Sequence, residues 1–385
     1  MGYTKQKYKI LLTGGGTGGS VAPLLAIITS PPTPLLIRRG EERSDGERYS
    51  FLWLGTRNGL EKEMVEGAGI KFKPIFSGKL RRYFSWRNFI DLIFIFLGFV
   101  QSFFIILKSR PNLVMSAGSF ASVPVVWASW LLRVPVLIHQ QDARPGLANK
   151  LMAPFAKVIT VTFEKSLADY GKKAIWTGNP AQNTKTRKHE NTKTRKHKNT
   201  KTQEIFNFKN DLPVVLVIGG GTGAAAINGL IKQGIGELTK FCNIIHVTGK
   251  NKKIQYSKSL RVTRYALREF LNAEQMSQAY AAADIAVSRA GMGVLTELSY
   301  LGKPAILIPM PDSHQEDNAK IFKEKQAAIV LNQKELTAEK LVENIKKLLN
   351  NRELQNKLSS NIKTVIKKGA NDRIVEIINN IIKKK

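Results

Sequence analysis

Short apolar runs alternate with segments of helical spacing along most of the chain. The runs predict strands at Tyr8–Leu12, Ser50–Leu54, Lys71–Phe76, Leu113–Ser116, Val134–His139, Val158–Val161 and Ala174–Trp176, then at Leu212–Ile218, Asn243–Val247, Asp284–Ser288 and Ala305–Ile308. Strands that alternate with helices are typical of parallel α/β sheets. The pattern therefore predicts an α/β protein.

Each half of the chain opens with a strand, a glycine-rich turn and a helix. The first turn is TGGGTGG at Thr13–Gly19 and the second is GGGTGA at Gly219–Ala224. Such turns place main-chain N–H groups at a helix start, where an anion is favoured, although glycine turns also serve packing. The first turn lacks a Walker lysine, which disfavours an ATPase. The repeated order predicts two Rossmann-like domains in tandem.

These patterns divide the chain into four predicted parts. They are an N-terminal domain over 1–180, a basic low-complexity linker over 181–210, a C-terminal domain over 211–370, and a helix over 371–385 that packs back on the N-terminal domain. Within the linker, Asn183–Thr202 repeats the unit NTKTRKH and has almost no apolar residue, so we expect it to be disordered. His189 and His197 are interpreted as solvated members of this repeat.

A third glycine turn lies in the C-terminal domain. The stretch Ala283–Asn318 predicts a strand, a turn at Arg289–Gly293, a helix over Val294–Leu301 and a further strand. Glu297 lies in the first turns of that helix. Its carboxylate suits the paired hydroxyls of a ribose, or it only complements the helix dipole.

Phe89–Leu107 is an apolar stretch that approaches the thickness of a bilayer core if it is helical. Asp91, Gly98 and Ser102 form one narrow stripe, with Gln101 beside it, which suits a helix that packs on protein along one side. The basic residues around it are Lys79, Arg81, Arg82, Arg87, Lys108 and Arg110. They suggest contact with an anionic leaflet, and the alternatives of a buried core helix and a spanning segment stay open.

Composition adds one strong feature, a formal net charge of +31. This charge implies attraction to polyanions, either nucleic acid or an anionic membrane surface. The single cysteine, Cys242, excludes an internal disulfide and suits a reducing cytosol. No apolar region typical of a signal peptide precedes the first glycine turn.

Several motifs together are specific in their order and spacing. They are the opening TGGGTGG, Ser77-Gly78, Ser116–Ser119, His139–Asp142 with Gly146–Lys150, Gly178-Asn179-Pro180, GGGTGA with Asn228, and Ala283–Ala319. In this order they resemble the MurG family of bacterial glycosyltransferases. The resemblance implies a GT-B fold, with two Rossmann-like domains whose parallel sheets face each other across a cleft.

The resemblance also implies an activity and a set of site residues. Such an enzyme moves N-acetylglucosamine (GlcNAc) from UDP-GlcNAc to lipid I, which is undecaprenyl-diphosphate-MurNAc-pentapeptide, to form lipid II of peptidoglycan. Leu271 would lie against the uracil, Met292, Gly293, Val294, Leu295 and Thr296 would line the diphosphate turn, Glu297 would bind the ribose and Gln315 the sugar. The acceptor side would use Thr17, Gly18, Gly19 and Asn149, and the family positions at Asp142, Gln182 and Gly221 complete the predicted set.

The chain departs from the family at several of these positions. Ser20 stands where the family has a histidine, a favoured candidate for the general base. Gln140-Gln141-Asp142 replaces Glu-Gln-Asn, Gln182 replaces an arginine, and Gly221-Thr222 replaces Ser-Gln. His139 and Asp142 remain as candidate bases, with the alternative that His139 is a satisfied strand-end residue.

The expected chemistry is a single inverting displacement, without a required metal or cofactor, at the cytoplasmic face of the inner membrane. No Asp-x-Asp pair suggests a metal-held diphosphate. Two alternatives stay open. One is another GT-B enzyme, such as a glycolipid glycosyltransferase or a UDP-GlcNAc epimerase. The other is a basic nucleic-acid-binding protein, although no RNA or DNA module with interleaved aromatics is present.

Overall fold

The computed structural model describes residues 7–16, 18–29, 48–59, 61–79, 86–182, 205–206, 208, 211–220, 223–249 and 264–383. The predictions for Thr17, Gly221 and the basic repeat lie outside these residues. The chain forms two compact units, one of Met1–Asn183 with Lys367–Lys385 and one of Thr184–Ile366. The last helix therefore belongs with the N-terminal unit.

The first unit has a parallel sheet with the strand order β3-β2-β1-β4-β5-β6-β7. Its strands are β1 (Lys7–Thr13), β2 (Arg48–Thr56), β3 (Lys71–Ile75), β4 (Leu113–Ser116), β5 (Val136–Gln140), β6 (Val158–Val161) and β7 (Ala174–Trp176). The strand β1 pairs in parallel with β2 on one side and β4 on the other. The loops after β1, β4 and β5 therefore meet at one edge of the sheet.

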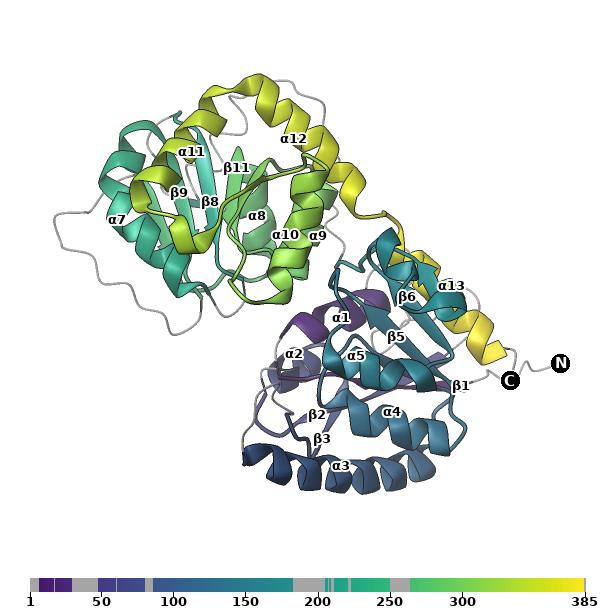
Figure 1. The fold of residues 1–385 in the computed structure, drawn as a ribbon. Helices are drawn as coiled ribbons and strands as arrows, with labels where there is room; N and C mark the ends of the chain where they lie inside the picture. Colours follow the sequence, from purple (N-terminus) through teal and green to yellow (C-terminus); the bar gives the residue numbers. More distant parts are fainter. Residues whose placement is uncertain are drawn as a thin grey trace. The chain divides into compact units, whose positions relative to one another are not determined.

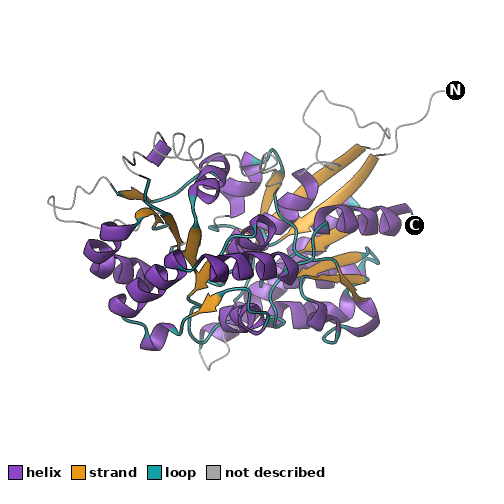
Figure 2. Cartoon of the chain, turned by 90° about the horizontal axis from the view of Figure 1, so that it is seen from above, coloured by secondary structure: helices purple, strands orange, loops and turns teal. Residues whose placement is uncertain are grey.

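Helices cover both faces of this sheet (Figure 1). They are α1 (Ala22–Thr29), α2 (Glu61–Gly67), α3 (Arg87–Ser109), α4 (Ser122–Leu131), α5 (Leu147–Met152) and α13 (Ala370–Lys383). Side chains alternate along β1, so that Ile10 and Leu12 pack with α1, α2 and α13 while Leu11 packs with α3, α4 and α5. Figure 2 shows the helices of the chain in purple and its strands in orange.

The C-terminal helix α13 is fixed to the first unit by polar and apolar contacts. The amide of Asn371 donates to the carbonyls of Ala26 (3.1 Å) and Ala181 (3.0 Å). The ammonium of Lys367 lies 4.4 Å from the centre of the Trp176 ring. Isoleucines on one face of α13 are buried in the core below α1. A helix from the far end of the sequence thus completes the N-terminal fold.

The stripe of small and polar residues that was predicted for α3 lies against the domain. Ser102 is fully buried, and the amide of Gln101 accepts the Phe76 N–H (3.0 Å) and donates to the Pro74 carbonyl (3.3 Å). A Cβ at Gly98 would collide with the Phe76 carbonyl, so only glycine allows this close approach. This face of α3 packs on the domain.

The opposite face of α3 is open to solvent. Its exposed apolar residues, each at least 49% exposed, are Phe89, Ile90, Leu92, Ile93, Phe96, Phe104 and Leu107. Only 22% of its most apolar stretch is buried, so α3 is not a buried core helix. Among the described helices, it alone is long and apolar enough to cross a membrane by length and composition.

The second unit has a parallel sheet with the strand order β10-β9-β8-β11-β12-β13. Its strands are β8 (Val214–Ile218), β9 (Asn243–Val247), β10 (Tyr265–Arg268), β11 (Ile285–Ser288), β12 (Ala305–Leu307) and β13 (Ile329–Val330). Its helices are α7 (Ala225–Phe241), α8 (Ala273–Ala282), α9 (Met292–Leu301), α10 (His314–Glu324), α11 (Ala338–Asn350) and α12 (Arg352–Val365). The turns after β8 and β11 lie side by side because these strands pair in parallel.

The predicted and observed elements differ mainly at their ends and at two strands. The strands β10 and β13 are additional to the prediction, and β13 is only two residues long. The helix predicted to begin at Val294 begins at Met292. This shift places the N–H groups of Met292, Gly293 and Val294 in the first turn of α9.

Candidate active site

The first glycine turn is held from two sides, by Glu61, which the sequence analysis did not single out, and by Gln141. Glu61, at the start of α2, is fully buried and accepts the N–H groups of Gly16 (3.1 Å) and Thr56 (2.8 Å). The Gln141 amide, after β5, donates to the carbonyls of Gly19 (2.9 Å) and Ala117 (3.1 Å). These bonds fix the turn against its neighbouring loops and preorganise its main chain. Gly18 is half-buried and Gly19 is exposed.

Ser20 stands at the position of the family histidine but cannot act as a general base in its place. Its side chain is buried, at 6% exposure, and its hydroxyl donates to the Gly15 carbonyl at 3.5 Å. A hydroxyl in this place has no proton affinity near neutral pH. Position 20 therefore supports the turn.

His139 has the geometry of a structural residue. It is fully buried, with Nδ1 2.9 Å from the Thr160 hydroxyl and Nε2 2.8 Å from the Asn179 side-chain oxygen. Burial lowers its pKa to about 4, against the opposing effect of the hydrogen bond to Asn179. The ring joins β5 to β6 and to the Gly178-Asn179-Pro180 motif.

Gln140 is the centre of a polar network at the end of β5. Its amide nitrogen donates to the carbonyls of Asp142 (2.7 Å) and Arg144 (3.3 Å), and its oxygen accepts from Asn149 (2.5 Å) and from the Tyr170 hydroxyl (2.9 Å). A glutamate at this position, as in the family, has no N–H to offer the two carbonyls. The network therefore fits glutamine and leaves the neighbouring Asp142 half-buried at the sheet edge.

Asn149 has an unpaired oxygen in this network. Its side chain is 6% exposed, and its Oδ1 has no hydrogen-bond partner among the described residues. Gly118, with φ +83°, passes close by, and a Cβ there would lie 2.8 Å from this oxygen. A buried acceptor without a donor costs stability unless a ligand satisfies it. Asn149 is thus available to a donor group on a substrate. Gln182, in contrast, is exposed.

In the second unit, the helices that follow glycine turns differ from their neighbours at the N-terminus. The helices α8, α10, α11 and α12 each begin with a side-chain cap, from Asn272, Ser313, Thr337 and Asn351 respectively. The helices α7 and α9 have Ala224 and Gly291 at their N-cap positions and no side-chain cap. Within the described residues no side chain caps their first-turn N–H groups, which makes these groups suitable donors to an anion.

The turn before α9 is braced by a buried cation. The Arg289 guanidinium is 9% exposed and donates to the carbonyls of Ile308 (2.9 Å) and Pro309 (3.1 Å). Burial lowers its pKa. Asn318, from α10, donates to the Ala290 carbonyl at 3.1 Å. Because the described partners of Arg289 are neutral carbonyls, the turn carries a positive charge as well as the helix dipole.

Glu297 presents a carboxylate one turn further along α9. Its Oε2 accepts the Tyr280 hydroxyl at 2.6 Å. Burial raises the pKa of Glu297, although the bond from Tyr280 acts in the opposite direction. Its Oε1 has no partner among the described residues.

The other predicted donor residues surround this turn in different ways. Gln315 is half-buried, and its oxygen accepts the Met310 N–H (3.0 Å), which leaves its amide nitrogen as the free donor within the described chain. Leu271 is buried at 5% exposure, just before α8. Met292, Leu295 and Thr296 are buried, Val294 is half-buried and Gly293 is exposed. Most side chains of this segment are therefore inaccessible to a ligand, and its contacts with a ligand would come mainly from the main chain.

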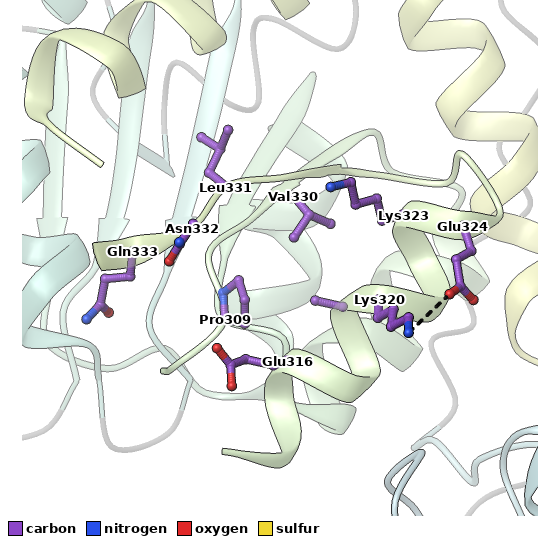
Figure 3. A pocket seen from close by; sticks show the side chains of 10 residues that line it. Pro309, Glu316, Lys320, Lys323, Glu324, Val330, Leu331, Asn332 and Gln333 are labelled. Carbon is purple, nitrogen blue, oxygen red and sulfur yellow. Dashed lines mark ion pairs between the residues drawn. The ribbon is translucent and has the colours of Figure 1, made fainter. Parts of the chain in front are cut away.

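A separate cavity of about 620 Å³ is lined by α10 and by the segment from Val330 to Gln333. It is lined by Pro309, Glu316, Ala319, Lys320, Lys323, Glu324, Val330, Leu331, Asn332 and Gln333 (Figure 3). The ammonium of Lys320 lies 3.8 Å from the carboxylate of Glu324, so these two opposite charges offset each other. The lining contains none of the residues predicted for the donor.

Two buried histidines predict acid sensitivity, one in each unit. Burial also lowers the pKa of His246 to about 4, and its ring lies between Tyr265 (2.7 Å) and Asn228 (3.0 Å). An unfolded histidine has a pKa of about 6.5, so the unfolded state binds more protons below that value and stability falls as the pH falls toward 4. We expect each histidine to cost about 2 kcal/mol of unfolding free energy between about pH 7 and about pH 5. Urea unfolding at both pH values measures this.

The control for this prediction is His139→Gln, which removes the titrating ring from the first unit. Its unfolding free energy should fall less between the two pH values than that of the unchanged chain. Equal losses in the two proteins would contradict the assignment of His139 as a buried neutral ring.

The matches to known proteins agree with this arrangement. The glycosyltransferase family 28 N-terminal domain matches residues 10–161, and the glycosyltransferase family 28 C-terminal domain matches residues 214–374. Two parallel-sheet α/β units with these matches define a GT-B glycosyltransferase. This is the fold class that the sequence predicted.

One curated relative identifies the family within that class. The chain is 37% identical over 345 residues to a UDP-N-acetylglucosamine–N-acetylmuramyl-(pentapeptide) pyrophosphoryl-undecaprenol N-acetylglucosamine transferase from Clostridium kluyveri, covering 88% of this chain and 91% of the relative. The chain belongs to this family, the MurG family.

Two solved structures share the fold. The Acinetobacter baumannii MurG crystal structure has a TM-score of 0.70 at 22% identity, covering 97% of this chain and 99% of that one. The UDP-GlcNAc 2-epimerase from Neisseria meningitidis bound to UDP-GlcNAc has a TM-score of 0.64 at 15% identity, covering 97% of this chain and 100% of that one. At these identities the likeness concerns the fold alone.

Proposed function

We propose that this chain transfers GlcNAc from UDP-GlcNAc to lipid I and so forms lipid II for peptidoglycan. The observation that carries this proposal is the pairing of an uncapped helix start with a half-buried carboxylate, Glu297, on the next turn of the same helix. In a nucleotide the diphosphate and the ribose are neighbouring groups. The uncapped start of α9 and Glu297 are likewise close together on one helix, so the first suits the diphosphate and the second the ribose. Membership of the MurG family supplies the sugar and the acceptor.

The second unit holds the donor in this proposal. The main-chain N–H groups of Met292–Thr296 and the charge of Arg289 stabilise the diphosphate, while Glu297 accepts hydrogen bonds from the ribose hydroxyls. The amide nitrogen of Gln315 donates to the sugar, and Leu271 forms the wall beside the uracil. Gly221, in the adjacent glycine turn, remains a predicted contact.

The first unit holds the acceptor. The turn with Gly18 and Gly19 faces the acceptor diphosphate and the transferred sugar, and Thr17 remains a predicted member of this turn. The unpaired Oδ1 of Asn149 accepts a hydrogen bond from the acceptor sugar. Gln182 is a neutral, exposed replacement for the family arginine and contributes less to phosphate binding.

The reaction is an inverting displacement at one carbon. The acceptor hydroxyl oxygen forms a bond to the anomeric carbon of GlcNAc as the bond from that carbon to the diphosphate oxygen breaks, and the hydroxyl proton passes to the Asp142 carboxylate. His139 is a poorer base because both of its nitrogens are occupied and its pKa is about 4. Charge that develops on the departing UDP is met by the α9 amides and Arg289, without a required metal.

A chromatographic assay that separates UDP, each UDP-sugar and its epimer tests this function against the epimerase alternative. The protein is given UDP-GlcNAc with and without a soluble lipid I analogue, in the presence of EDTA, and UDP-glucose and UDP-GalNAc serve as competing donors. We expect release that depends on the acceptor and favours UDP-GlcNAc. Release or isomerisation that needs no acceptor would contradict the proposal.

The exposed face of α3 is proposed to bring the enzyme to the cytoplasmic surface of the inner membrane. Its apolar residues cover one side of a long helix, and exposed Lys108 and Arg110 follow at its end. Trp130 and Leu131 add exposed apolar surface at the end of α4, which packs on α3. Apolar area with basic flanks binds anionic lipid, so the net charge serves a membrane and not a specific nucleic acid.

Charged substitution on this face tests the membrane proposal. Ile93 and Phe96 are 60% and 64% exposed, so Ile93→Asp with Phe96→Asp should spare the fold. Loss of two apolar contacts should weaken binding to phosphatidylglycerol vesicles by at least about 10-fold, with UDP-GlcNAc affinity unchanged. Vesicle sedimentation measures the effect, with Ile175→Asp on β7 as the control. Unchanged vesicle binding in the double variant would contradict a role of α3.

A further inference from the structure

The hydroxyl of Tyr280 is the described protein partner of the Glu297 carboxylate. Tyr280 is 2% exposed on α8, and its hydroxyl lies 2.6 Å from Oε2 of Glu297 on α9. Burial, the charge of Glu297 and the hydrogen bond between them raise the pKa of Tyr280 well above its ordinary value. The phenol therefore stays protonated and donates to the carboxylate.

This bond limits how the carboxylate can turn. The terminal torsion of a glutamate is broad, so an unrestrained carboxylate samples many orientations. With Oε2 held by Tyr280, the plane of the group is set and Oε1 is left without a partner among the described residues. A carboxylate fixed in this way binds two adjacent hydroxyls with less loss of entropy than a mobile one.

The helix that carries Tyr280 also begins beside the predicted uracil contact. Leu271 directly precedes Asn272, whose side chain accepts the Gln275 N–H (2.9 Å), while the Gln275 side chain accepts the Asn272 N–H (3.0 Å). This capping box fixes the start of α8. One rigid helix thus carries Tyr280 and follows immediately after the residue predicted to contact the base.

We propose that Tyr280 is a positioning residue for nucleotide recognition: through its hydrogen bond it holds the Glu297 carboxylate for the vicinal 2′- and 3′-hydroxyls of the uridine ribose. This rests on the proposed function, in which Glu297 binds that ribose. Tyr280 does not touch the substrate. Its contribution appears as discrimination between ribose and deoxyribose.

The test compares the affinities of UDP and 2′-deoxy-UDP, measured by calorimetry on the full chain. Tyr280→Phe removes one oxygen from a buried ring and should preserve packing. We expect UDP to bind about 10-fold more weakly to this variant, the size of one hydrogen bond to a charged group, while 2′-deoxy-UDP changes about 2-fold or less. The ratio of the two affinities should therefore fall. Tyr265→Phe, which removes the hydroxyl that contacts His246, is the matched control and should leave the ratio unchanged.

A second pair of variants separates this inference from the proposed function. Glu297→Gln should itself reduce the ratio, and adding Tyr280→Phe to it should have no further effect on the ratio. If Glu297→Gln reduces the ratio but Tyr280→Phe does not, the positioning role is wrong and the donor site stands. If neither variant changes the binding of UDP, the donor site itself is wrong.

Discussion

Glu297→Ala should lower kcat/KM for UDP-GlcNAc by at least about 100-fold, because two hydrogen bonds from ribose hydroxyls to a carboxylate are each worth roughly 1.5–3 kcal/mol. The substitution shortens a half-buried side chain on α9 and leaves the glycine turn and its first-turn amides in place. Initial-rate kinetics with a lipid I analogue measure the change.

Two comparisons make this result specific. Glu353→Ala changes an exposed glutamate on α12 and should retain full activity. Uridine lacks the diphosphate but keeps the ribose, so its affinity should also fall in the Glu297 variant. Retained activity in Glu297→Ala, with the fold intact, would contradict the ribose contact. The carboxylate would then only complement the dipole of α9.

Asp142→Asn should lower kcat by about 100-fold and leave KM for UDP-GlcNAc nearly unchanged, since a general base contributes roughly 10²–10⁴ to a rate. Among His139, Asp142 and Ser20, Asp142 alone combines an ionisable group with partial exposure at the carboxyl edge of the first sheet. Asparagine has nearly the same shape, and the backbone carbonyl of residue 142 would still accept the bond from Gln140.

The control for the base is Asp169→Asn, an exposed aspartate near β7 that should keep its activity. Single-turnover rates distinguish a slower chemical step from slower product release. An unchanged single-turnover rate in Asp142→Asn would remove Asp142 as the base and would return the question to groups outside positions 20, 139 and 142.

Much of the fold follows from the spacing of apolar residues, because parallel strands buried on both faces are short, continuous apolar runs. The strand over Leu113–Ser116 and the helix spacing around Gly98 are examples that the structure confirms. The strand β13 is too short to show a pattern, and β10 has only two consecutive aliphatic residues, Ala266 and Leu267, before the charged Arg268. The exposure of α3 could not be read from composition alone, since buried and interfacial helices are both apolar.

The site is less predictable because its partners come from distant parts of the sequence. Glu61 reaches Gly16 only because β2 pairs with β1, and Tyr280 reaches Glu297 only because α8 and α9 are neighbours. No spacing rule connects such residues. The local sequence signal for Glu61 was a glutamate at the start of a predicted helical segment, and this is a common way to begin a helix.

The most direct test of the proposed transfer is to identify its product. The purified protein is incubated with UDP-GlcNAc and a lipid I analogue, and the acceptor is then analysed by mass spectrometry and NMR. We expect an acceptor that has gained one N-acetylhexosamine, joined with inversion at the anomeric carbon, and one UDP for each product. Recovery of the unmodified acceptor, or a product with retained configuration, would contradict the proposed function.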